Sequence, residues 1–252
     1  MRRLLMLLAA CLAVCTVSAQ RRDSVYTASE QFQWKKMVVP VSLIGAGTIA
    51  SFTPWYHDQV NLPVRNWVLS QSGGRELGID NYTQVAALAG YAVAALCGAG
   101  EHGFWEQALL GFTALGLTYG SAESLKSLID KTRPNGRDRS FPSGHTAVAF
   151  MGAELVRLEY GPWWGLSAYC LAGFTAVMRG WNNRHWTSDV VTGAGIGILM
   201  ANAAYWLLPL ERRLLRLDSK RVSGQHYRFC AVPYATAFPQ GTSYGITLSC
   251  LW

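Results

Sequence analysis

The sequence predicts an all-α protein, a bundle of about six apolar helices embedded in a membrane, with a small C-terminal β-hairpin. Half of the 252 residues are hydrophobic and only 15% are charged, whereas a typical soluble domain carries about 25% charge. Six apolar segments follow one another along the chain. The 25 glycines and 10 tryptophans suit helices that pack closely in a membrane and aromatic side chains at its surface. The six segments are 37–53, 84–100, 105–122, 145–159, 162–178 and 190–209.

The N-terminus has the pattern of a secretory signal. Residues 1–19 contain Arg2 and Arg3, an apolar stretch, and small residues up to Ala19. We interpret them as a signal peptide or an uncleaved signal anchor; a lipoprotein site ending at Cys11 is the alternative. Residues 20–36 form a polar N-terminal segment. The net charge is +7, and this excess suits anionic lipids or phosphate compounds. No basic stripe is interleaved with aromatic residues, so we expect no nucleic-acid partner.

The helical domain is expected to span 37–210. Several of its apolar segments have only 15–17 residues, whereas a spanning helix needs about 20, so a soluble bundle is the alternative. The small-residue pattern Gly193-x-x-x-Gly197 favours membrane packing. The segment 54–83 reads as a loop because it contains Pro54, Pro63 and adjacent glycines. Tryptophans also stand at segment ends, as membrane-interface residues do: Trp55, Trp105, Trp163, Trp164 and Trp206.

Residues 211–252 change character to a basic tail followed by two strands. Alternating apolar residues predict strands over 227–238 and 243–252, around a turn at 239–241. If that turn centres on Gln240, Cys230 and Cys250 face each other, and a disulfide between them would require an oxidising compartment. Cys97 and Cys170 lie in apolar segments and are expected to be buried thiols.

Three short clusters contain residues suited to chemistry. In the third, His185 and Asp189 are four residues apart, which at a helix start places them on one face. The carboxylate can then accept the imidazole Nδ1–H and leave Nε2 as a free lone pair. This arrangement predicts a nucleophile or base with its orienting group. Asp189 would also help to cap the helix.

The second cluster predicts an anion site at a helix N-terminus. Pro142 disfavours helix before it, Ser143 is a good N-cap, and Gly144 leaves the backbone uncovered. The free N–H groups of such a helix start attract anions. His145, on the first turn, is placed to donate a proton to a leaving oxygen.

The first cluster adds cations. Lys126 and Arg133 are seven apart, about two turns if the segment is helical, and Arg179 contributes a third charge. Together they could neutralise a phosphoryl group. No acidic cluster suited to Mg²⁺ accompanies them, so we expect phosphoryl transfer without a metal or other cofactor. Other nearby cations are interpreted as local charges: Lys131, Arg137, Arg139 and Arg184.

The three clusters together resemble the type 2 phosphatidic acid phosphatase superfamily, which also includes vanadium haloperoxidases and bacterial class A acid phosphatases. The family pattern is Lys-x6-Arg-Pro, then Pro-Ser-Gly-His, then Ser-Arg-x5-His-x3-Asp. It is met at Lys126, Arg133 and Pro134, at 142–145, and at Arg179, His185 and Asp189. Met178 stands where the family usually has Ser, a position peripheral to the chemistry. The resemblance covers about 125–210.

The resemblance implies a metal-independent phosphatase in which His185 forms a phosphohistidine, Asp189 orients it, and His145 protonates the leaving group. Lys126, Arg133, Ser143, Gly144 and Arg179 would bind the phosphoryl oxygens. Domain 37–210 would then be the helical phosphatase domain. We expect a phosphorylated lipid as substrate, either a monoester or a diphosphate. Secreted acid phosphatase, haloperoxidase and non-catalytic scaffold are the alternatives.

The orientation signals conflict. Positive residues after the last segment favour a cytoplasmic tail and a site outside, whereas a cleaved signal followed by six full spans would invert this topology. We expect an exported site, on the periplasmic or extracellular side of the membrane.

Overall fold

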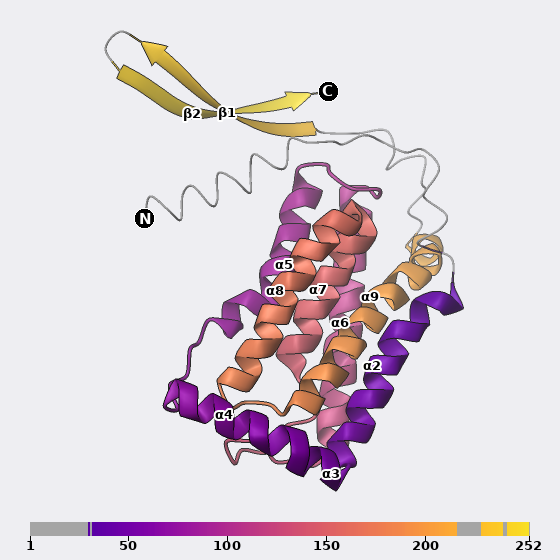
Figure 1. Ribbon diagram of the computed structural model, residues 1–252. Helices are drawn as coiled ribbons and strands as arrows, with labels where there is room; N and C mark the ends of the chain where they lie inside the picture. Colours follow the sequence, from indigo (N-terminus) through magenta and orange to yellow (C-terminus); the bar gives the residue numbers. More distant parts are fainter. Residues whose placement is uncertain (1–29, 31, 216–227, 239–240, 252) are drawn as a thin grey trace.

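The computed structural model describes residues 30, 32–215, 228–238 and 241–251, the last two ranges as backbone only. Residues 34–214 form a helical bundle (Figure 1). Four of the six apolar segments found in the sequence lie wholly within one helix, whereas 37–53 and 84–100 extend past the ends of theirs at Phe52 and Leu96. The signal predicted at 1–19 and most of the predicted polar segment 20–36 fall outside the described residues. The six helices that contain the apolar segments are α2 (Trp34–Phe52), α5 (Asp80–Leu96), α6 (Phe104–Leu128), α7 (Gly144–Tyr160), α8 (Pro162–Trp181) and α9 (Thr187–Leu214).

Helices α7 and α9 form the centre of the bundle, and small residues let them approach closely. Met151 and Leu155 of α7 and Tyr205 of α9 are fully buried. A Cβ added at Gly193 would lie 2.5 Å from the Ser143 carbonyl oxygen, and one at Gly197 would lie 2.1 Å from that of Ala147. The glycine pattern of α9 is therefore a packing face, as predicted, and it is directed at α7.

The prediction of a loop over 54–83 is wrong. The chain forms α3 (Pro54–Tyr56), a π-helical turn η1 (His57–Asn61) and α4 (Leu62–Ser72), and α5 already begins at Asp80. Pro54 and Pro63 occupy the first positions of helices, where a missing N–H costs nothing. Only Gly73, with φ 57° after α4, ends a helix as the sequence suggested. Helix α2 and the α3–α4 unit are bent by 87°, so α4 lies across one end of the bundle (Figure 1).

Length and composition make α9 a candidate membrane span, with 61% of its most apolar window buried inside the protein. The bent pair formed by 34–52 and 54–72 passes the same test only if it counts as one span. The bundle exposes many large apolar side chains, among them Phe112, Leu128 and Trp163, each at least 76% exposed.

A buried ionic cluster lies at the bundle end opposite α4. The His102 imidazole is held by Glu159 through Nδ1 (2.9 Å) and by Glu30 through Nε2 (3.1 Å). Arg212 of α9 joins Glu30 (2.8 Å) and Glu106 (2.6 Å). Arg212 therefore belongs to the helical domain, and the boundary expected at 210 lies inside α9, which ends at Leu214.

Strands β1 (Arg228–Phe238) and β2 (Gly241–Leu251) pair antiparallel. Their register pairs Cys230 with Ser249 and Phe229 with Cys250. The two cysteines are therefore offset by one residue in the register, whereas a turn centred on Gln240 would have placed them opposite each other. The expectation for Cys97 and Cys170 is also wrong, since both are exposed free thiols.

Candidate active site

Two loops and the start of α5 meet at the end of the bundle covered by α4. The loop 129–143 leads from α6 to α7, and the loop 182–186 leads from α8 to α9. The Ser143 N–H donates to the Asp189 carbonyl oxygen (3.1 Å), and the Trp186 indole N–H donates to the Thr132 carbonyl oxygen (2.8 Å). These bonds bring the three sequence clusters together at one site.

His185 is buried and firmly oriented. Its Nδ1 lies 2.7 Å from the Ser140 carbonyl oxygen, which can only accept, so Nδ1 carries the hydrogen. Burial, followed by the charges of Arg179 and Arg133, holds the pKa of His185 well below its usual value. Within the described part of the chain, Nε2 makes no hydrogen bond. The imidazole is therefore neutral, with a free lone pair on Nε2.

The expected hydrogen bond between Asp189 and His185 is absent from the described structure. Helix α9 begins at Thr187, so His185 lies outside it and the spacing rule for helix faces does not apply. The Asp189 carboxylate turns instead to the Ser140 hydroxyl (2.5 Å), the Lys131 ammonium (2.6 Å) and the Trp186 N–H (3.2 Å). The last of these bonds caps α9, as the sequence suggested. Among the described residues, the hydrogen bonds that connect the Asp189 carboxylate with the His185 ring run through Ser140.

His145 lies in the first turn of α7, with Nε2 3.1 Å from the Asn81 amide oxygen. Burial, followed by the charge of Arg179, lowers its pKa to about 4 even though Asp80 opposes the shift. The unliganded side chain is therefore neutral near neutral pH.

The cations gather around the same place. A Cβ added at Gly144 would lie 3.1 Å from the Lys126 Nζ, which also pairs with Glu123 (2.8 Å). Arg133 and Arg179 each have a buried Nε–H without an acceptor in the described structure. A buried guanidinium donor is costly to leave unpaired, so these two groups indicate a place for a bound oxyanion. Arg133 lies beyond the end of α6 at Leu128, so the helical spacing considered for it and Lys126 does not apply.

Ser143 is the N-cap residue of α7, and its side chain contacts the Thr146 hydroxyl (3.0 Å) rather than a backbone N–H. The N–H groups of Gly144 and His145 find no acceptor within the described residues. Such free N–H groups at a helix start are suited to anions.

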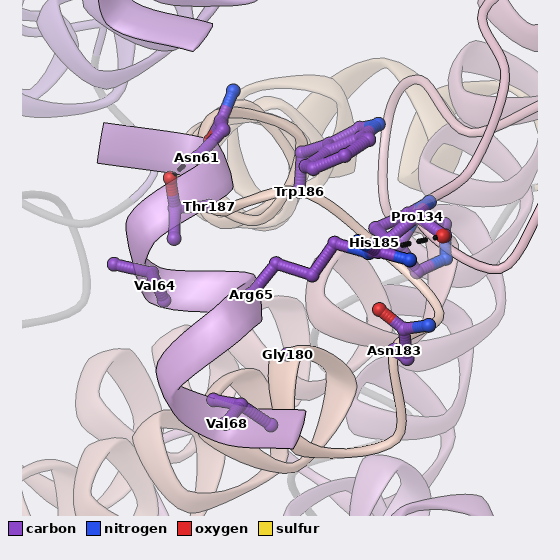
Figure 2. A pocket seen from close by; sticks show the side chains of 10 residues that line it. All are labelled: Asn61, Val64, Arg65, Val68, Pro134, Gly180, Asn183, His185, Trp186 and Thr187. Atoms are coloured by element: carbon purple, nitrogen blue, oxygen red, sulfur yellow. Dashed lines mark hydrogen bonds between the residues drawn. The ribbon is translucent and has the colours of Figure 1, made fainter. Parts of the chain in front are cut away.

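Helix α4 contributes Arg65 to the site, a residue that no sequence motif indicated. Arg65 extends from α4 toward the loops, and its Nε–H donates to the Pro134 carbonyl oxygen (3.2 Å) (Figure 2). Arg65 and Asn183 line one small pocket together with His185. Because a loop was predicted over 54–83, no signal in the sequence connected Arg65 with the site.

The start of α5 supplies two further residues. The Asp80 carboxylate forms a buried ion pair with Arg179 and accepts a hydrogen bond from Asn182 (3.0 Å). Asn81 contacts His145. No motif links these residues to the other clusters, and only the position of α5 shows the connection.

Residues 120–213 match the family model described as the PAP2 superfamily. A lipid A 1-phosphatase of Porphyromonas gingivalis is 38% identical over 156 residues, covering 58% of this chain and 34% of that protein. The chain thus spans about a third of the length of this curated relative.

Two solved structures are also similar. A crystal structure of Aquifex aeolicus LpxE has 23% identity and a TM-score of 0.43, covering 57% of this chain and 94% of that one. A transmembrane PAP2-type phosphatidylglycerolphosphate phosphatase from Bacillus subtilis has 17% identity and a TM-score of 0.37, covering 85% and 98%. The family match, which includes every predicted site residue, confirms the resemblance found in the sequence: residues 120–213 carry the pattern of the PAP2 superfamily.

Proposed function

We propose that this protein is a metal-independent phosphatase that hydrolyses phosphate monoesters or diphosphates of lipids through a phosphohistidine intermediate. One observation carries the proposal. The buried His185 presents a free Nε2 at the site where Arg133 and Arg179 have buried N–H donors without acceptors. A phosphoryl group there would meet both a nucleophile and the donors that stabilise its charge.

In the first step, His185 Nε2 attacks phosphorus in line with the leaving oxygen. The N–P bond forms, the P–O bond to the lipid breaks, and His145 protonates the departing oxygen. Lys126, Arg133 and Arg179, together with Ser143 and Gly144, hold the phosphoryl oxygens. In the second step, water attacks phosphorus and gives its proton to His145, so that phosphate leaves and His185 is restored.

The lowered pKa of His145 fits this sequence of events. Without substrate, burial and the neighbouring Arg179 keep His145 neutral. A phosphoryl group brings up to two negative charges, which offset the field of Arg179 and favour the imidazolium. The acid would thus be charged only when there is a leaving group to protonate.

A lipid substrate is supported by the surface of the bundle, whose exposed large apolar side chains suit a membrane. The lipid A 1-phosphatase named above makes phosphorylated glycolipids the first class to test. We place the site on the periplasmic or extracellular side. Reporter fusions after Ala19 and near Asn135 test this placement, and cytosolic reporter activity at Asn135 would refute it.

The test of function compares phosphate release by the wild-type protein and His185→Gln. The substrates are lipid A and phosphatidic acid in detergent micelles and p-nitrophenyl phosphate in water. Wild type should prefer the lipids, keep its activity in EDTA and be inhibited by vanadate. His57→Gln is the matched control, because His57 contacts the Trp186 ring (4.8 Å between centroids) but has no proposed role in phosphoryl transfer.

His185→Gln should release no phosphate from any substrate. Phosphate release at the wild-type rate would refute the mechanism. Preference for the soluble ester would favour the secreted acid phosphatase instead.

A further inference from the structure

Lys131 belongs to the loop 129–143 that helps to form the candidate site, and its ammonium group contacts a buried carboxylate. Its Nζ is 2.6 Å from Asp189 Oδ1 and 3.3 Å from the Ser188 hydroxyl. The lysine side chain is 14% exposed and that of Asp189 is fully buried. Among the described residues, Lys131 is the one basic side chain that pairs with this carboxylate. Lys131 was expected to be a local charge, whereas in the structure it is the counter-ion of Asp189, the aspartate of the third motif cluster.

A continuous set of hydrogen bonds connects Lys131 with His185. The second oxygen of Asp189 accepts the Ser140 hydroxyl (2.5 Å), and the Ser140 carbonyl oxygen accepts His185 Nδ1–H (2.7 Å). The Ser140 N–H in turn donates to the Lys131 carbonyl oxygen (2.7 Å). Ser140 is fully buried. The N–H, the hydroxyl and the carbonyl oxygen of Ser140 are thus all hydrogen-bonded. The N–H is held by the Lys131 carbonyl and the hydroxyl by Asp189, which is the partner of the Lys131 ammonium.

We propose that Lys131 is a positioning residue for the nucleophile. Its charge holds the Asp189 carboxylate in place, the carboxylate holds Ser140, and the Ser140 carbonyl fixes the His185 ring in the orientation and tautomer that expose Nε2. Lys131 itself does not touch the substrate. The expected loss in kcat rests on the proposed function. The expected change in the orientation and tautomer of His185 does not.

The physical reason lies in the burial of Asp189. A buried carboxylate that loses its counter-ion must move toward water or take up a proton. Either change weakens or breaks the hydrogen bond from the Ser140 hydroxyl and so loosens the backbone carbonyl that anchors His185. A displacement of about 1 Å in a reacting group costs about 100-fold in rate. The loss should therefore appear in kcat, because the groups that bind the phosphoryl oxygens stay in place.

The first experiment compares Lys131→Met with Lys131→Arg. Arg137→Met is the matched control, because Arg137 is an exposed cation of the same loop. With phosphatidic acid in micelles, Lys131→Met should lower kcat about 100-fold and change KM less than threefold. Lys131→Arg should recover most of the loss, and Arg137→Met should match wild type. A raised KM with unchanged kcat in Lys131→Met would mean that Lys131 binds substrate, and would overturn the proposal.

The second readout does not depend on activity. Nitrogen-15 NMR of the imidazoles, with the His185 signals assigned from His185→Gln, reports which ring nitrogen carries the hydrogen. Wild type and Arg137→Met should show a hydrogen-bonded Nδ1–H, and Lys131→Met should show a mixture of tautomers. An unchanged Nδ1–H signal in Lys131→Met would overturn the proposal even if the protein proved not to be a phosphatase.

Ser140→Ala tests the same path without disturbing the ion pair, so the proposal stays testable if Lys131→Met misfolds. The variant removes the hydroxyl that donates to Asp189 and leaves Lys131 and Asp189 paired. It should reproduce the change in the His185 signals. It should also add little to the effect of Lys131→Met in the double variant, since coupled residues act on one path. Fully additive losses in kcat would refute the path through Ser140.

Discussion

Gly197 of α9 offers a sharp test of how the bundle is packed. A Cβ at this position would lie 2.1 Å from the Ala147 carbonyl oxygen and 2.7 Å from the Met151 N. Both are backbone atoms of α7 and cannot turn aside as a side chain can. Gly197→Ala therefore forces the two helices apart by about 1 Å along their contact.

The expected loss of stability combines two effects of opposite sign. Overpacking a buried contact costs about 1–3 kcal/mol, and the backbone obstacle places this variant near the upper end. The change to Ala also favours the helix by about 1 kcal/mol. We expect a net loss of about 2 kcal/mol. Gly173→Ala is the matched control, because it is also mid-helix and an added Cβ meets no atom within 4 Å; it should gain about 0.5–1 kcal/mol.

The assay is urea unfolding in mild detergent, followed by circular dichroism at equal protein concentration. The two variants should differ by about 3 kcal/mol in the free energy of unfolding. Equal stability of Gly197→Ala and Gly173→Ala would refute the close contact of α7 and α9, and with it the geometry that brings Ser143 beside Gly193.

Three further predictions follow from the site and from the opposite end of the bundle. Asp80→Asn removes the charge that pairs with Arg179 and so loosens the position of this guanidinium in the site. We expect kcat/KM for p-nitrophenyl phosphate to fall about 100-fold. A loss below threefold would contradict the role of this pair. The pKa of His145 is lowered from 6.5 to about 4 in the folded protein, so the unfolded chain binds the proton more tightly and stability should fall as pH falls from 6.5 to 4. His145→Asn should make the urea concentration at the unfolding midpoint less dependent on pH in this range, and an unchanged slope would count against the shift. Burial alone would lower the pKa of His102, but hydrogen bonds to Glu159 and Glu30 raise it to about 10. The stability that the charged His102 contributes is therefore complete below pH 6.5 and lost as pH rises through 10. His102→Gln should lose stability mainly at neutral pH, and an equal loss at pH 11 would argue against a charged His102.

The sequence predicted most of the helices because their apolar segments are long and carry their own start and stop signals. Pro142-Ser143-Gly144 marked the start of α7. The same kind of signal misled at 54–83, where prolines at helix starts were taken for turns. A proline fixes a local backbone angle, but whether a helix or a turn follows depends on what the segment packs against. Here α4 packs over the site loops.

The family pattern predicted which residues gather at the site, but not how they are connected. The hydrogen bond expected between His185 and Asp189 depended on a helix start two residues earlier than the real one. Ser140, Asp80 and Asn81 stand outside the motif positions and were not identified, and Lys131 was interpreted as a local charge.

The sequence alone was enough to predict the helical class, the small-residue face of α9 and the order of the three motif clusters, because each depends on neighbouring residues or on fixed spacing. The pairing of Asp189 with Lys131, the hydrogen bond from His185 to the Ser140 carbonyl and the position of α4 over the site could be seen only in the folded chain. Those contacts join residues 45–69 positions apart, and hydrogen-bond partners at such separations are selected by which backbones meet in the packed bundle.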